Sequence, residues 1–128
     1  MITNFLAETH ELNQYELEVL QPIIIKGLQN KIGNDKAVTN QYICDCLKEQ
    51  QYKITNARLR KIIHNIRAKD LIPCLIATSK GYYISEDVNE IEIYIQSLGE
   101  RAQSIAFIKN ALKRQLNNKI NNQIEFDI

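Results

Sequence analysis

The sequence predicts a mainly α-helical protein with one small β-hairpin and a long C-terminal helix. Apolar residues recur at helical spacing in several separate segments, an apolar run with a polar tip lies between residues 71 and 84, and a second apolar seam starts at Val88. The 128 residues, 45% of them hydrophobic and 24% charged, suit one compact domain with an extension. We expect a folded domain at residues 1–85, a helix at 86–118 and a flexible tail at 119–128.

The first predicted helix covers residues 14–30. Its apolar positions are Leu17, Leu20, Ile24 and Leu28. Pro22 lacks an N–H donor and its ring clashes with the preceding turn, so a kink or break is expected just before it. The segment 31–36, which contains Gly-Asn-Asp, predicts a loop, and residues 37–38 predict a short edge strand.

Two capped helices follow. Thr39 is the expected N-cap of a helix that runs to about Glu49, and Thr55 is the expected N-cap of the next. Two helices joined so tightly indicate a helix-turn-helix. The second has one apolar face, made of Leu59, Ile62, Ile63 and Ile66. The opposite, outward face is predicted to carry Ala57, Arg60, Lys61, His64 and Ala68.

A β-hairpin is predicted at 71–84, with its tip at residues 78–81. Strand alternation is expected to send one of Tyr82 and Tyr83 inward and the other outward. The long helix should start from a cap at Ser85 or Asp87. Its seam has heptad spacing at Val88, Ile91, Ile95, Leu98, Ala102 and Ile105. This helix either completes the core or pairs with its copy in a homodimer.

The net charge of +1 conceals an uneven distribution. Residues 55–83 carry six bases and one acid, whereas residues 1–30 carry four acids and one base and residues 84–104 five acids and one base. A basic centre with acidic neighbours is typical of a protein that presents one face to a polyanion. A solvated helix face is the alternative interpretation.

The segments ITNARLRKIIHNIR and IPCLIATSKGYYI carry a family resemblance. In them the chain resembles the winged helix-turn-helix family of bacterial and phage DNA-binding proteins, over about residues 12–85, and is similar to the small members found in phage and prophage gene clusters. The resemblance implies a winged helix-turn-helix fold, in which the helix from Thr55 enters the major groove and the hairpin is the wing. It implies double-stranded DNA as partner and a role as a transcriptional regulator or a replication accessory of a phage or mobile element.

The expected DNA contacts follow from this placement. Base or groove contacts are assigned to Asn56, Arg60, Lys61 and His64, where Arg60 suits guanine and Asn56 suits adenine. Phosphate contacts are assigned to Arg58, Arg67, Lys69 and Lys80. Polar contacts from the preceding helix are a weaker expectation for Thr39, Asn40 and Gln41.

No enzymatic machinery is recognisable, because His64 has no nucleophile motif, phosphate loop or metal cluster to accompany it. Cys44 and Cys46 would point about 200° apart on a helix, so no metal or cofactor is expected. An odd number of cysteines, and no signal peptide or membrane span, predict a cytoplasmic protein without membrane association. The alternative to DNA binding is a non-catalytic protein-protein interaction module on the same fold, with the C-terminal helix as its docking surface.

Overall fold

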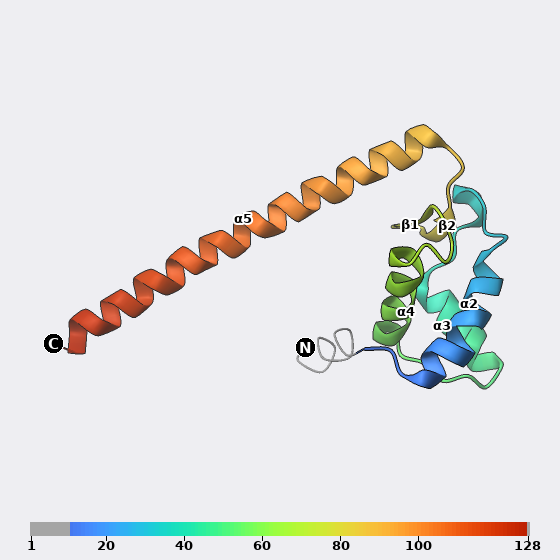
Figure 1. The fold of residues 1–128 in the computed structure, drawn as a ribbon, viewed down its shortest axis with the longest axis horizontal. Coiled ribbons are helices and arrows are strands. Elements are labelled where there is room, and N and C mark those ends of the chain that lie inside the picture. The colour runs from blue at the N-terminus through green and yellow to red at the C-terminus, as the bar shows by residue number, and fades with distance from the viewer. Residues whose placement is uncertain (1–10, 128) are drawn as a thin grey trace. The chain divides into compact units, whose positions relative to one another are not determined.

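The computed structural model describes residues 11–127, with side chains described to residue 122. The chain is mainly helical with one two-stranded antiparallel sheet and a long C-terminal helix (Figure 1). It divides into two compact units, Met1–Ile91 and Glu92–Ile128, so the first unit ends six residues beyond the predicted domain boundary at 85. In the described part of the chain, no helix is both long enough and apolar enough to cross a membrane.

The first helical segment changes type at the proline. A π-helical turn, η1 (Glu16–Leu20), leads directly into α2 (Gln21–Leu28), and the Gln21 N–H donates to the carbonyl of Glu16, five residues back. Since Pro22 has no N–H and its ring crowds the carbonyl four residues before it, a wider turn at this point relieves both problems. The predicted interruption before Pro22 therefore takes the form of a π turn.

The π turn also changes which side chains are buried. Leu20, Ile24 and Leu28 lie in the core as predicted, but Leu17 is 40% exposed and Glu16 is only 4% exposed. The wider turn holds more residues than an α turn, so the positions before it rotate away from the face that α-helical spacing predicts. The predicted burial of Leu17 is wrong for this reason.

Helices α3 (Asn40–Glu49) and α4 (Asn56–Ala68) pack against each other. Their caps are those predicted: Thr39 Oγ1 accepts from the Tyr42 N–H at 3.0 Å, and Thr55 Oγ1 accepts from the Arg58 N–H at 3.2 Å. Each hydroxyl satisfies one donor that a helix start leaves unpaired. The sequence thus specifies where both helices begin.

Strands β1 (Leu75–Thr78) and β2 (Gly81–Ile84) form the hairpin, with Leu75 opposite Ile84. The edge strand predicted at residues 37–38 is reduced to one bridge, in which Val38 and Tyr82 exchange hydrogen bonds of 3.0 and 2.7 Å. This close approach requires glycine at position 81, where φ is +120° and a Cβ would lie 2.3 Å from the Val38 carbonyl oxygen. A short 3₁₀ turn, η2 (Asn34–Lys36), precedes the bridge.

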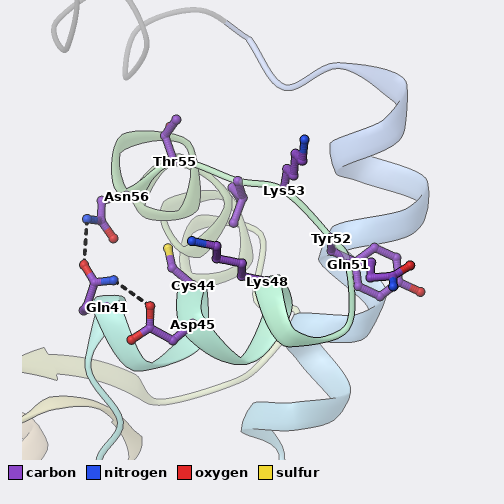
Figure 2. Close-up of a pocket in the computed structure, with 10 residues that line it drawn as sticks. Gln41, Cys44, Asp45, Lys48, Gln51, Tyr52, Lys53, Thr55 and Asn56 are labelled. Atoms are coloured by element: carbon purple, nitrogen blue, oxygen red, sulfur yellow. Dashed lines mark hydrogen bonds between the residues drawn. The ribbon is translucent and has the colours of Figure 1, made fainter.

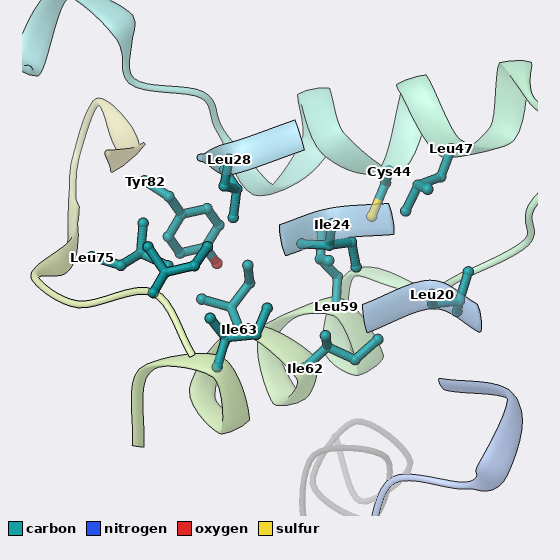
Figure 3. Close-up of a cluster of buried hydrophobic side chains, with 12 residues drawn as sticks. Leu20, Ile24, Leu28, Cys44, Leu47, Leu59, Ile62, Ile63, Leu75 and Tyr82 are labelled. Atoms are coloured by element: carbon teal, nitrogen blue, oxygen red, sulfur yellow. The ribbon is translucent and has the colours of Figure 1, made fainter. Parts of the chain in front are cut away.

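The core of the first unit lies between α2, α3, α4 and the hairpin (Figure 3). The predicted inward face of α4 is confirmed, because all four of its members are buried: Leu59, Ile62, Ile63 and Ile66. Ala57, predicted outward, is only 5% exposed. Helical spacing does not account for the burial of the first turn of α4, which lies where α3 and α4 are in contact.

Tyr82 and Tyr83 are both buried, at 9% and 2% exposure, so the prediction of one inward and one outward ring is wrong. The rings leave opposite faces of the strand, but the chain after β2 covers the second face, where the Tyr83 hydroxyl donates to Glu90 Oε2 at 2.8 Å. The prediction from strand alternation required one face of β2 to be exposed to solvent, but both faces are covered at these two residues.

Helix α5 (Val88–Asp127) begins at the predicted cap, where Asp87 Oδ1 accepts from the Asn89 N–H at 2.9 Å. It continues to residue 127, so the helix extends past the predicted end near 118 and through residues 119–127 of the segment expected to be a tail at 119–128. The asparagine-rich end has low intrinsic helix propensity, but propensity is a weak guide to where a long helix stops. Residue 128 lies outside the described residues.

Candidate nucleic-acid interface

Basic side chains gather on the solvent side of α4 and at the hairpin tip. Helix α4 contains four arginine or lysine residues and no acid. Arg60 and His64, four residues apart and hence on one side of the helix, are exposed, and Lys61 beside them is half-buried. Lys80 is exposed in the two-residue loop between β1 and β2. Arg60 and Lys61, two of the predicted contact residues on α4, thus form a cationic surface.

Two arginines of α4 lie close to the hairpin. Burial raises the pKa of the Tyr82 hydroxyl, and the positive charges of Arg60 and Arg67 partly oppose that rise. The Arg67 side chain also donates from Nε to the Leu75 carbonyl at 3.1 Å. Arg67 is half-buried and holds the start of β1, so part of its donor capacity serves the fold.

Arg58 is engaged inside the protein. Its Nε donates to Glu16 Oε2 at 2.8 Å and its Nη2 to Glu16 Oε1 at 2.5 Å, with a further bond from Nη2 to the Glu11 carbonyl at 3.0 Å. The Glu16 carboxylate also accepts from the Asn13 N–H at 2.9 Å, while Asn13 Oδ1 accepts from the Glu16 N–H. The bidentate pair therefore ties the first helical turn to α4.

The pairing changes the titration of both groups. The hydrogen bond from Arg58 lowers the pKa of the Glu16 carboxyl, and the same bond raises the pKa of Arg58. The side chains are 6% and 17% exposed, respectively. Because the guanidinium fork is occupied, the structure gives the predicted phosphate contact at Arg58 no support.

A chain of side-chain hydrogen bonds joins the hairpin to the starts of α3 and α4. The buried Tyr82 hydroxyl donates to Asn40 Oδ1 at 2.8 Å, and Asn40 Nδ2 donates to Asn56 Oδ1 at 3.1 Å. Asn56 Nδ2 donates to Gln41 Oε1 at 3.0 Å, and Gln41 Nε2 donates to Asp45 Oδ1 at 2.8 Å. We call Asn40, Gln41 and Asn56 the amide cluster.

The amide cluster has spare hydrogen-bonding capacity on the surface. Gln41 and Asn56 are exposed and Asn40 is half-buried, and each amide NH₂ group carries two donor hydrogens. The bonds along the chain fix the orientation of both exposed amides, which otherwise would rotate freely. All three residues were expected as DNA contacts, but the sequence carries no signal for their connection, because the connection depends on the approach of β2 to the start of α3.

An open pocket of about 900 Å³ lies beside this cluster, between α3 and the turn that leads to α4 (Figure 2). Lys48 and Lys53 stand on its rim, and Cys44 lies at its inner side. Burial raises the pKa of the Cys44 thiol, which disfavours the reactive thiolate. Among the described residues no three His, Cys, Asp or Glu side chains are grouped to hold a metal ion.

The remaining predicted contact residues are placed separately. Lys69 is exposed immediately after α4, and Thr39 is exposed but its hydroxyl is used as the cap of α3. Glu16 was not singled out by the sequence analysis, although the Asn13-x-x-Glu16 spacing is that of a capping box. No family model, curated protein or solved structure matches this chain.

Proposed function

We propose that this protein binds double-stranded DNA through a winged helix-turn-helix, as a transcriptional regulator or a replication accessory of a phage or mobile element. In this proposal α3 and α4 form the helix-turn-helix, α4 is the recognition helix and the hairpin is the wing. The main observation in support is the exposed basic side of α4. The helix contains no acidic residue, and its basic side lies beside the hairpin. The role implies a cytoplasmic, non-catalytic protein that uses no cofactor.

Electrostatics supports the proposal through the exposed basic side chains near α4 and the hairpin tip. Arg58 is paired to Glu16, whereas Arg60, Lys69 and Lys80 are exposed and Lys61 is half-buried on and next to α4 and at the hairpin tip. Exposed cations of this kind neutralise phosphates and release counterions, which gives affinity without sequence preference.

The amide cluster supplies a means of reading sequence. An asparagine or glutamine amide can pair in bidentate fashion with the N6 and N7 atoms of adenine, a contact worth about 1–3 kcal/mol of discrimination. Asn56 stands at the first residue of α4, and the N-terminal residues of a recognition helix are those that reach base edges. The Asn56 amide is held in one orientation by its hydrogen bonds, so less conformational entropy is lost when it pairs with a base, and discrimination between bases is favoured.

The test is binding to random double-stranded DNA across a salt series, by fluorescence anisotropy, for the wild type and for the double variant Arg60→Ala, Lys61→Ala. We expect binding that weakens with salt, and a variant that binds more weakly with a salt slope smaller by up to about 2. A matched control, Lys26→Ala with Lys36→Ala, removes the same charge from exposed sites outside α3, α4 and the hairpin.

Either of two results would refute the proposal: no binding of the wild type at low salt, or equal losses in the two double variants. The first would favour the second candidate, a non-catalytic protein-protein interaction module. The observation that favours this candidate is the exposed apolar surface of α5, with Ile105 and Phe107 more than 70% exposed.

A further inference from the structure

The second unit is one helix whose apolar side chains are exposed. Among the side chains described from residue 92 to 122, none is buried. One stripe runs along the helix at Val88, Ile91, Ile95, Leu98, Ala102, Ile105, Ile108, Leu112, Leu116 and Ile120. Its nine steps cover 32 residues, about 3.6 per step, so the stripe stays on one side of a straight helix.

The exposure along this stripe is large. Ile95 is 61% exposed, Ile105 71%, Ile108 56%, and Leu112 and Leu116 58% each. Long helices in water depend on burial of an apolar face for most of their stability. A continuous apolar stripe over more than thirty residues is therefore a surface for a partner helix.

Charge along residues 86–119, which cover the cap and most of α5, is divided into two halves, and Glu125 and Asp127 follow near the end of the helix. Residues 86–100 contain five acids and no base, and residues 101–119 contain five bases and no acid. Compensation of the helix dipole acts only within the first and last turns, so it does not account for a division that extends over residues 86–119. Two copies side by side in parallel would place acid beside acid and base beside base, whereas antiparallel copies would place acids beside bases.

The apolar stripe is also nearly symmetric about Ile105. When two copies are antiparallel with Ile105 facing its own copy, Leu98 lies level with Leu112, and Ile95 and Ile91 lie within one residue of Leu116 and Ile120, respectively. Ala102 then lies level with Ile108 and one residue from Lys109, where its small side chain leaves room for the lysine stem. Arg101 lies level with Lys109, a like-charged exception near the axis.

We propose that α5 pairs antiparallel with α5 of a second copy of this chain, with the two-fold axis at Ile105. The partner is a second copy because the stripe complements itself in size and the two charge halves complement each other. This inference is independent of DNA binding, since none of its residues lies in the first unit except Val88 and Ile91 at the start of α5.

The first test is the mass in solution, by analytical ultracentrifugation from low to high micromolar concentration, of the full chain and two variants. Ile105→Asp places two carboxylates at the axis, whereas Phe107→Asp places the same charge about 160° around the helix at a site of almost equal exposure, 72%. We expect dimers for the wild type and Phe107→Asp, and at least a tenfold weaker association for Ile105→Asp. A monomeric wild type, or equal effects of the two variants, would overturn the pairing.

Orientation is tested by disulfide trapping in a background of Cys44→Ala, Cys46→Ala and Cys74→Ser, checked for its helical circular dichroism. Leu98→Cys and Leu112→Cys variants are oxidised separately and as a mixture. In the antiparallel pair the two copies of position 98 are about 21 Å apart along the axis, too far for a disulfide, whereas 98 faces 112. We expect cross-linked dimers only in the mixture. Cross-linking of either variant alone would show parallel helices and overturn the orientation.

Discussion

Replacement of Arg58 by alanine should destabilise the protein without removing a DNA contact. The change leaves the Glu16 carboxylate, 6% exposed, without its bidentate partner. Breaking a fully buried ion pair on one side costs about 3–5 kcal/mol. Glu16 keeps its bond from the Asn13 N–H and Arg58 is 17% exposed, so we expect a smaller loss of about 2–3 kcal/mol.

The assay is urea unfolding followed by circular dichroism, without DNA, with DNA affinity measured separately at a temperature where the variant is folded. Arg60→Ala is the matched control, since it removes an exposed arginine two residues away on the same helix. We expect Arg58→Ala to lose stability and keep its DNA affinity, and Arg60→Ala to do the reverse. A stability change below about 0.5 kcal/mol for Arg58→Ala, together with a loss of DNA affinity, would refute this reasoning.

Three further predictions follow from the same structure. The folded-state pKa of Glu16 is lowered, so the stability that its carboxylate contributes is present above the ordinary pKa of 4.5 and is lost as pH falls through the folded-state pKa. The stability difference between wild type and Glu16→Gln should therefore shrink between pH 7 and pH 3, and a constant difference would contradict this. Gly81→Ala should lower the free energy of unfolding in urea by more than about 2 kcal/mol, because its Cβ would strike a backbone carbonyl. Gly27→Ala, with open space in α2, should raise it by about 0.5–1 kcal/mol, and stability changes of the same sign in the two variants would contradict this. Tyr82→Phe should reduce discrimination between DNA sequences and leave the salt dependence of binding unchanged. Tyr83→Phe, which also loses one 2.8 Å hydrogen bond, should change neither discrimination nor salt dependence, and equal losses of discrimination in the two variants would contradict this.

Local signals predicted the elements of the first unit well. Thr39 and Thr55 mark helix starts because a hydroxyl before an apolar periodic segment satisfies the unpaired amides. The inward face of α4 follows from its period, and Gly81 marks the turn of the hairpin. These features depend on residues within one or two turns of each other, which is the range over which a single sequence carries information.

The errors arose where the surroundings of a side chain depend on residues outside its own periodic segment. Leu17 is exposed because Pro22 induces a π turn, and Tyr83 is buried because Glu90, seven residues later, covers it. Arg58 was assigned to phosphate from its charge, whereas its partner Glu16 lies 42 residues earlier in the chain. Charge alone cannot separate a cation that binds the protein from one that faces solvent, so the pairing of Arg58 with Glu16 could not be predicted from it.

The DNA proposal and the pairing proposal can be separated experimentally because their residues belong to different compact units. Ile105→Asp should weaken pairing at least tenfold and leave the affinity of one copy for a short duplex unchanged, since no basic residue of the first unit is altered. The double variant Arg60→Ala, Lys61→Ala should leave the mass in solution unchanged and weaken binding to the same duplex. If Ile105→Asp also removed binding to a duplex too short for two copies, α5 would itself contribute to the DNA surface, and the assignment of α4 as the recognition helix would need revision.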